Sequence, residues 1–234
     1  SSVGPVMVPF LGEIRVGFTG SVMPDEVVAT EIHISDQFSE LLGNGQFAYE
    51  LEETRNLSGT VELANDADGE SYSATFELVG DLLQARVTLV NALLQRGGSL
   101  PLEGKVSGDL QVSGVYSSPD IEMAVSLTEG RLNGDAITLA VAGTLDQRSL
   151  TVETLNLDYV SNRLRDAEGE FDFTEGTFDF KGAFSSAFRD LPITSALGFS
   201  GSFGRAFSRA DLGEAPRADF AGTLIAGDIG FGDE

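Results

Sequence analysis

Apolar residues alternate with polar or small residues over most of residues 102–184, and this period of two is the feature that most restricts the fold. Successive side chains of a β-strand point to opposite faces of a sheet, whereas a helix repeats roughly every 3.6 residues. The run Ile121, Met123, Val125, Leu127 shows the alternation plainly, with Glu122 between its first two members. The pattern predicts a succession of strands, each with one apolar and one polar face.

Short segments rich in turn-forming residues separate these runs. Examples are Ser118-Pro119-Asp120, Asn133-Gly134 and Glu175-Gly176. They are too short for the crossover that parallel strands need, so neighbouring strands are predicted to pair antiparallel as a meander. Similar but less regular alternation occurs over residues 14–78. The expected fold class is therefore mostly β, an elongated antiparallel sheet.

Three segments depart from simple alternation. Residues 36–42, 90–96 and 185–196 are predicted as short helices, the first two from capping residues at their ends and the third despite an internal proline. Within residues 150–159 the apolar positions change from even to odd numbers. This change predicts a bulge or a bend near Thr154 that would keep all of them on one face.

A shift of 49 residues aligns two parts of the chain without a gap. Residues 57–63 fall on 106–112, and the alternating positions from Tyr72 to Leu78 fall on those from Ile121 to Leu127. This self-similarity predicts an internal repeat. The chain is interpreted as one segment, residues 1–234, of a longer repeat protein, with possible sub-units at 35–88, 89–184 and 185–234.

Charge and composition exclude several functions. Fourteen Lys and Arg against 37 Asp and Glu give a net charge of −23, which repels the phosphates of nucleic acids. Cysteine is absent, so disulfides, thiolate metal sites and a cysteine nucleophile are excluded. The apolar stretches are shorter than the roughly 20 residues of a membrane-spanning helix.

No motif indicates catalysis or a cofactor. The single histidine, His33, lies between two isoleucines on the polar side of a predicted strand, as a solvated surface residue would. Residues 65–70 imitate part of a calcium loop, but Ala64 and Thr75 stand where the first and the bidentate ligands would be, so a hairpin turn is predicted. Residues 43–45 lack the third glycine of a dinucleotide-binding loop. The protein is therefore expected not to be an enzyme.

Phenylalanine is abundant, with sixteen residues against no tryptophan, and most of them lie from Phe171 onward. Phe171, Phe173, Phe178 and Phe180 alternate across the Glu175-Gly176 turn. Such an arrangement serves either a packed core or the lining of an apolar groove, and periodicity does not separate the two.

Several stretches resemble the repeat region of the translocation and assembly module B (TamB) family, within the AsmA-like group. They are residues 99–114, 118–121 and 130–134, continued by 150–159 and 163–173. The resemblance implies a sheet curled into a taco-like groove with an apolar interior. It also implies a periplasmic segment of an inner-membrane-anchored protein in a diderm bacterium. Such proteins are associated with phospholipid transport to the outer membrane and with outer-membrane protein assembly, so an outer-membrane assembly barrel protein is a possible partner.

A groove of this kind would hold phospholipid acyl chains, the expected partner. Exposing roughly thirty methylenes to water costs about 0.8 kcal/mol each, or on the order of 20 kcal/mol. The alternating apolar positions are the expected lining: Ile121, Met123, Val125, Leu127, Ile137, Leu139, Val141, Leu155, Leu157, Tyr159, Phe171, Phe173, Phe178 and Phe180.

Two other functions are compatible with the same strands. An open sheet edge could pair with a strand of a client outer-membrane protein, which would make the segment a chaperone-like module acting by β-augmentation. Alternatively, the apolar faces could close into the dry core of a surface β-barrel of a binding lipoprotein. These alternatives stay open at the level of sequence.

Overall fold

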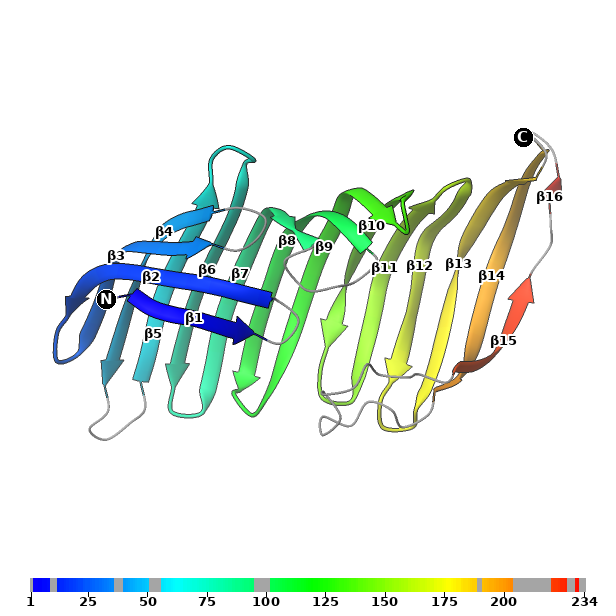
Figure 1. The fold of residues 1–234 in the computed structure, drawn as a ribbon. Helices are drawn as coiled ribbons and strands as arrows, with labels where there is room; N and C mark the ends of the chain where they lie inside the picture. The colour runs from blue at the N-terminus through cyan, green and yellow to red at the C-terminus, as the bar shows by residue number, and fades with distance from the viewer. Residues whose placement is uncertain are drawn as a thin grey trace. The chain divides into compact units, whose positions relative to one another are not determined.

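The computed structural model describes residues 2–8, 12–35, 40–50, 56–94, 102–188, 191–203, 220–226 and 230–231. Its elements are β-strands joined mainly by short turns, and the described residues contain no α-helix (Figure 1). The strands are β1 (Ser2–Val8), β2 (Gly12–Val22), β3 (Glu26–Ser35), β4 (Glu40–Glu50), β5 (Asn56–Asn65), β6 (Glu70–Val79), β7 (Leu82–Leu93), β8 (Leu102–Val115), β9 (Ser118–Leu132), β10 (Asp135–Leu145), β11 (Ser149–Tyr159), β12 (Asn162–Asp172), β13 (Thr177–Phe188), β14 (Leu191–Phe203), β15 (Phe220–Ala226) and β16 (Gly230–Phe231).

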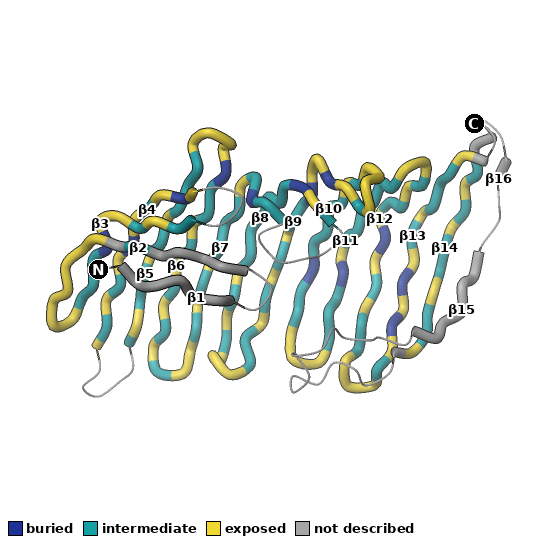
Figure 2. Tube along the Cα trace, in the orientation of Figure 1, coloured by how far each residue is buried: buried dark blue, intermediate teal, exposed yellow. Residues whose placement is uncertain are grey.

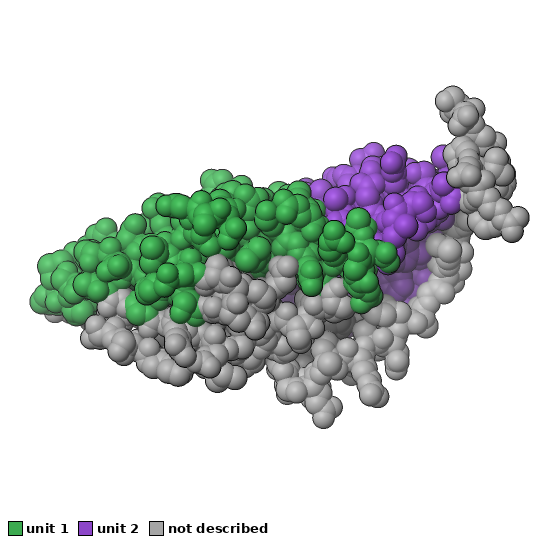
Figure 3. All heavy atoms as spheres, turned by 45° about the horizontal axis from the view of Figure 1, so that its top comes forward, with its two compact units in different colours: residues 1–136 green, residues 137–234 purple. Residues whose placement is uncertain are grey.

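The chain divides into two compact units, residues 1–136 and 137–234 (Figure 3). In unit 1 the strands from β1 to β9 pair antiparallel in the order of the sequence. In unit 2 the strands from β10 to β15 do the same, and β16 pairs with β14. The predicted antiparallel meander is therefore confirmed in each unit. The division falls inside residues 89–184, which the sequence groups together.

The sheet of unit 1 is open and curled. Its first strand, β1, has β2 as its only neighbour in the strand order, so the sheet does not close on itself. Figure 1 shows β1 and β2 running across the strands from β5 to β8. This curl agrees with the predicted fold class.

The three predicted helices are wrong wherever they can be compared. Residues 40–42 begin β4, and residues 90–93 end β7. Residues 185–188 belong to β13 and residues 191–196 to β14. Almost all other positions of the three segments lie outside the described residues. The physical reason is the ladder of backbone hydrogen bonds between strands, because each of these segments continues a strand that is already paired with a neighbour. Adding one ladder bond per residue outweighs a weak local preference for helix.

The 49-residue shift reproduces the strand register. Leu57 pairs with Leu78 in the β5–β6 hairpin, and Val106 pairs with Leu127 in the β8–β9 hairpin. The same offset relates all the other pairs of β5–β6 to pairs of β8–β9. The sequence repeat thus corresponds to two hairpins with the same register. The segments before them that were predicted as helices are strands where the structure describes them.

The irregularity predicted near Thr154 is confirmed, and it is a bulge rather than a bend. Ala142 pairs with Thr154, whereas the next residue, Gly143, pairs with Val152. Glu153 is therefore the extra residue in β11, and the shift lets Val152 and Leu155 face the same side.

The turn after β11 contains a strained residue that offers a test. Val160 has a φ of 56° and is 67 % exposed, between the paired residues Tyr159 and Asn162. A left-handed conformation costs a β-branched residue about 1–2 kcal/mol, and asparagine tolerates it. Val160→Asn is expected to raise the free energy of unfolding by about 1 kcal/mol in urea titrations.

The control for this substitution is Val79→Asn, at a valine that is 49 % exposed within β6 and has no positive φ. It should leave the free energy of unfolding unchanged or slightly lower it, because asparagine is a poor strand former. Equal effects of the two substitutions would contradict the assignment of strain to Val160.

Candidate functional site

In unit 1 the register gathers the apolar residues of the strands from β4 to β9 on one face of the sheet. They form three rows that cross the strands, since directly paired residues share a face. The rows are Phe47, Gly59, Phe76, Ala85, Val112, Ile121; then Gly45, Val61, Ala74, Val87, Leu110, Met123; and then Gly43, Leu63, Tyr72, Leu89, Gly108, Val125. We call this surface the unit 1 apolar face.

Three of the residues predicted to line a groove belong to these rows. Ile121, Met123 and Val125 are half-buried on this face, and Leu127, further along β9, is only 4 % exposed. The sequence predicted which β9 residues share a face. It did not predict their partners on β5 to β8, because pairing across strands depends on register.

A glycine makes room for two aromatic rings on the unit 1 apolar face. A Cβ at Gly59 would stand 2.7 Å from Cε1 of Phe76 and 2.8 Å from Cδ1 of Phe47. The two ring centroids are 6.1 Å apart. The rings therefore occupy the space that a side chain at Gly59 would fill, as in other cross-strand glycine–aromatic pairs.

The unit 1 apolar face is only partly covered. Among the described residues of this unit the buried apolar side chains are those of Ala29, Leu41, Ala92 and Leu127, and the only buried member of the three rows is Gly45, which has no side chain. Figure 2 shows that the strands from β5 to β8 consist mostly of half-buried and exposed residues. Leu57, next to the rows on β5, is 39 % exposed. The side chains of the three rows are therefore half-buried, and part of this apolar surface remains exposed.

Unit 2 differs because its own phenylalanines fill its apolar face. Val152, Phe178 and Phe180 are 6 %, 8 % and 4 % exposed, and they form a buried cluster. The centroid of the Phe171 ring lies 4.9 Å from that of Phe180, and the Phe199 ring lies 5.4 Å from it in a stacked arrangement. Val141, Leu150, Leu155 and Phe171 pack against this cluster.

The other residues predicted in unit 2 occupy the positions expected from alternation, with one difference. Ile137 pairs with Tyr159 and Leu139 with Leu157, and all four are half-buried. Phe173 instead lies in the turn after β12 and is 39 % exposed. The strand ends there because the Asp172 carboxylate accepts hydrogen bonds from the backbone N–H groups of Thr174 and Glu175.

A buried carboxylate borders the unit 1 apolar face. Glu70 is 1 % exposed and accepts hydrogen bonds from Tyr72 Oη at 2.5 Å and from the backbone nitrogen of Leu93 at 3.2 Å. The β7–β8 register shifts just before this point, between Leu89 and Ala92. Glu70 thus satisfies a backbone donor beside a bulge, which is a structural role.

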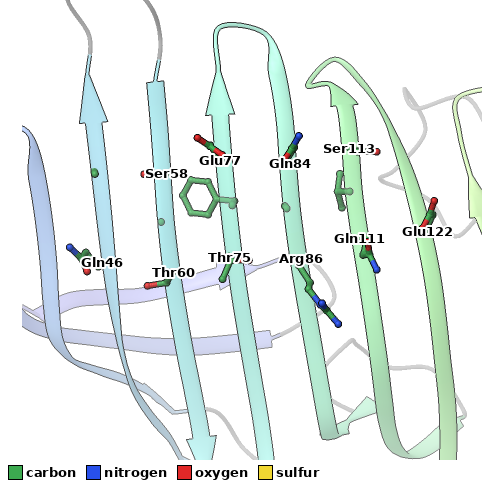
Figure 4. Close-up of a pocket in the computed structure, with 15 residues that line it drawn as sticks. Gln46, Ser58, Thr60, Thr75, Glu77, Gln84, Arg86, Gln111, Ser113 and Glu122 are labelled. Atoms are coloured by element: carbon green, nitrogen blue, oxygen red, sulfur yellow. The ribbon is translucent and has the colours of Figure 1, made fainter.

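A hollow of about 710 Å³, also in unit 1, is lined mainly by polar residues of the strands from β4 to β9 (Figure 4). Paired polar positions form two rows in its lining: Gln46, Thr60, Thr75, Arg86, Gln111, Glu122 and, beside them, Ser58, Glu77, Gln84, Ser113. This hollow was not predicted from the sequence, although most of its residues are the polar members of the same alternating runs. Such a lining offers hydrogen-bond donors and acceptors to water or to a polar ligand.

Arg86 in unit 1 and Arg165 in unit 2 are each engaged by a carboxylate. Arg86 Nη2 lies 3.0 Å from Asp109 Oδ1, and Thr88 Oγ1 donates to the same oxygen at 2.7 Å. The hydrogen bond from Thr88 and then that from Arg86 lower the pKa of Asp109 below its ordinary value. In unit 2 the hydrogen bond from Arg165, at 2.6 Å, is the main cause of a lowered pKa at Asp158.

The residues that were not expected to be catalytic or metal-binding make ordinary surface and turn contacts. His33 lies on β3 with a 46 % exposed side chain and pairs with Glu40. Asn65 Oδ1 accepts a hydrogen bond from Ala67 N at 3.0 Å, so the acidic segment forms the turn between β5 and β6, as predicted. No group of acidic or histidine side chains in the described ranges could hold a metal ion.

Comparison with family models, with curated proteins and with solved structures finds no match to this chain. The resemblance to the TamB family therefore rests on the sequence pattern alone. Among the described residues, no helix is long and apolar enough to cross a membrane.

Proposed function

We propose that the unit 1 apolar face binds the acyl chains of phospholipids, and that the chain is a periplasmic segment of a TamB- or AsmA-like protein that moves phospholipid between the inner and outer membranes. The observation that carries the proposal is the combination of three apolar rows with their incomplete burial. Large accessible apolar patches on proteins commonly mark binding surfaces.

The dimensions of the face suit a lipid chain. Neighbouring strands lie about 4.8 Å apart, so a row across six strands extends about 24 Å. The acyl chains of one leaflet span about 15 Å, half the hydrocarbon thickness of a bilayer. Each methylene that moves from water onto this face gains up to about 0.8 kcal/mol, which is enough to shelter a chain during transfer.

Charge favours recognition of the chains over the headgroup. The three rows contain no lysine, arginine, aspartate or glutamate. Arg86, which lies among the polar positions of the same strands, already contacts Asp109. A phosphate would find no free positive partner among the rows and would remain in water, so we expect little selection between phospholipid headgroups.

Adjacent residues of β9 provide a matched test of the binding face. Met123 is half-buried on the unit 1 apolar face, whereas Ala124 is exposed and lies at a position of opposite parity. The chain has no cysteine, so Met123→Cys and Ala124→Cys each give a single labelling site. After bimane labelling, phosphatidylcholine carrying a nitroxide on its acyl chain should quench Met123→Cys several-fold more strongly than Ala124→Cys.

Mass spectrometry of the purified segment before and after delipidation complements the quenching measurement. We expect co-purified phospholipid that is lost together with the difference in quenching. Equal quenching at the two sites, or no bound lipid and no exchange of a fluorescent lipid, would count against the proposal.

A further inference from the structure

The turn between β9 and β10 contains one of the two Asn-Gly pairs of the chain. Asn133 has a φ of 52° and Gly134 a φ of 91°, and both residues are exposed. Positive φ at both central residues is the geometry of a type I′ turn, for which Asn-Gly is a preferred sequence. The pair therefore lies in a solvent-exposed hairpin turn.

This turn leaves the groups that can react with each other unprotected. No atom lies within 4 Å of the position that a Cβ of Gly134 would occupy, and the hydrogen bond from Arg131 Nη1 to this turn goes to the Gly134 carbonyl oxygen, at 3.2 Å, rather than to a reacting group. In a type I′ turn the hydrogen bond joins the two flanking residues, so the Gly134 N–H is not required for it. Both residues of the turn are exposed, so neither reacting group belongs to a buried residue.

We propose that Asn133 is a site of spontaneous deamidation and isoaspartate formation. The Gly134 backbone nitrogen attacks Cγ of Asn133, its proton passes to the departing amino group, and ammonia leaves as a succinimide ring closes. Water then adds to one of the two ring carbonyls and breaks its bond to nitrogen, which yields aspartate or isoaspartate. The net change replaces an amide by a carboxylate and consumes only water.

The second pair, Asn44-Gly45, has the same sequence in protected surroundings. Gly45 is buried in β4, where it pairs with Ala29 on β3 and with Val61 on β5. A Cβ there would lie 3.0 Å from the carbonyl oxygen of Thr60. Ring closure at this site requires opening of a strand that is paired on both sides.

Isoaspartate at position 133 would have a structural consequence. It inserts one additional backbone carbon into a two-residue turn whose geometry depends on two positive φ angles. The modification also adds one negative charge to a chain that already carries −23. We therefore expect modified molecules to have a weakened β9–β10 hairpin.

Peptide mapping by mass spectrometry, on the folded protein held at mildly alkaline pH, tests the proposal. Deamidation is expected to be about tenfold or more faster at Asn133 than at Asn44, because only the second site must first open locally. Isoaspartyl methyltransferase should label the peptide that contains Asn133, and Asn133→Gln should abolish this labelling.

The same incubation in concentrated urea is the control, since unfolding should make the two rates similar. Equal rates at Asn133 and Asn44 in the folded protein would overturn the proposal. So would an unmodified Asn133 in the folded protein under conditions where both sites react in urea. Neither outcome bears on lipid binding by the unit 1 apolar face.

Discussion

Phe180→Ala is expected to lower the free energy of unfolding of unit 2 by about 3–5 kcal/mol, the cost of removing a buried phenylalanine from a packed cluster. Phe180 is 4 % exposed and forms the buried cluster together with Val152 and Phe178. Its ring centroid is 4.9 Å from that of Phe171 and 5.4 Å from that of Phe199, so the truncation removes several ring contacts at once.

Urea unfolding followed by far-UV circular dichroism measures the loss, and hydrogen exchange of the amides in β11 to β13 assigns it to unit 2. The matched control is Phe199→Ala, because Phe199 touches the same ring but is 40 % exposed. Its expected cost is about 1–2 kcal/mol. Similar small losses from both substitutions would mean that unit 2 has no sealed core, and its apolar face would then join that of unit 1 as a candidate lipid surface.

Much of this fold was predictable because its determinants are local. Alternation identified the faces of β9, β10 and β11, and the turn residues between them required antiparallel neighbours. The parity change in β11 located the bulge opposite Gly143. In each case the decisive information lies within about a dozen adjacent residues, where strand periodicity and turn chemistry act.

The errors arose where pairing partners decide the structure. Residues 90–93 look like the start of a helix in isolation, yet they extend β7, where Ala92 pairs with Val106 on β8. The sequence also did not predict that the apolar face of unit 2 is filled by a buried cluster whereas that of unit 1 is half-buried. Phe178 and Phe171 pair across a hairpin of unit 2, and their rings cover the apolar face of that unit. Gly108 and Val125 pair in the same way in unit 1, but a glycine and a valine cover less of the sheet. Alternation alone treats both as equivalent.

Gly169→Ala is expected to lower the free energy of unfolding of unit 2 by up to about 3 kcal/mol, as over-packing of a full core does. Gly169 pairs with Val152 on one side and with Phe180 on the other. A Cβ at this position would lie 2.2 Å from the carbonyl oxygen of Asp179 and 2.6 Å from the Phe180 ring. Because the first of these atoms belongs to the backbone, the ladder between β12 and β13 must shift to admit even a methyl group.

Gly198→Ala is the matched control in the same sheet. The nearest atom to a Cβ there is the carbonyl oxygen of Phe180 at 3.8 Å, an ordinary contact. Its expected effect is within about 0.5 kcal/mol in the same urea titration. If Gly169→Ala were as mild as this control, the close packing of Phe180 over Gly169 would be refuted.

The double substitution Gly169→Ala with Phe180→Ala separates the two sources of the clash. Removal of the ring relieves the contact with Phe180 but leaves the contact with the Asp179 carbonyl. The cost of Gly169→Ala should therefore be smaller in the Phe180→Ala background and should not vanish. A strictly additive pair would show that the ring and the glycine do not share space, because residues that compete for one volume couple energetically.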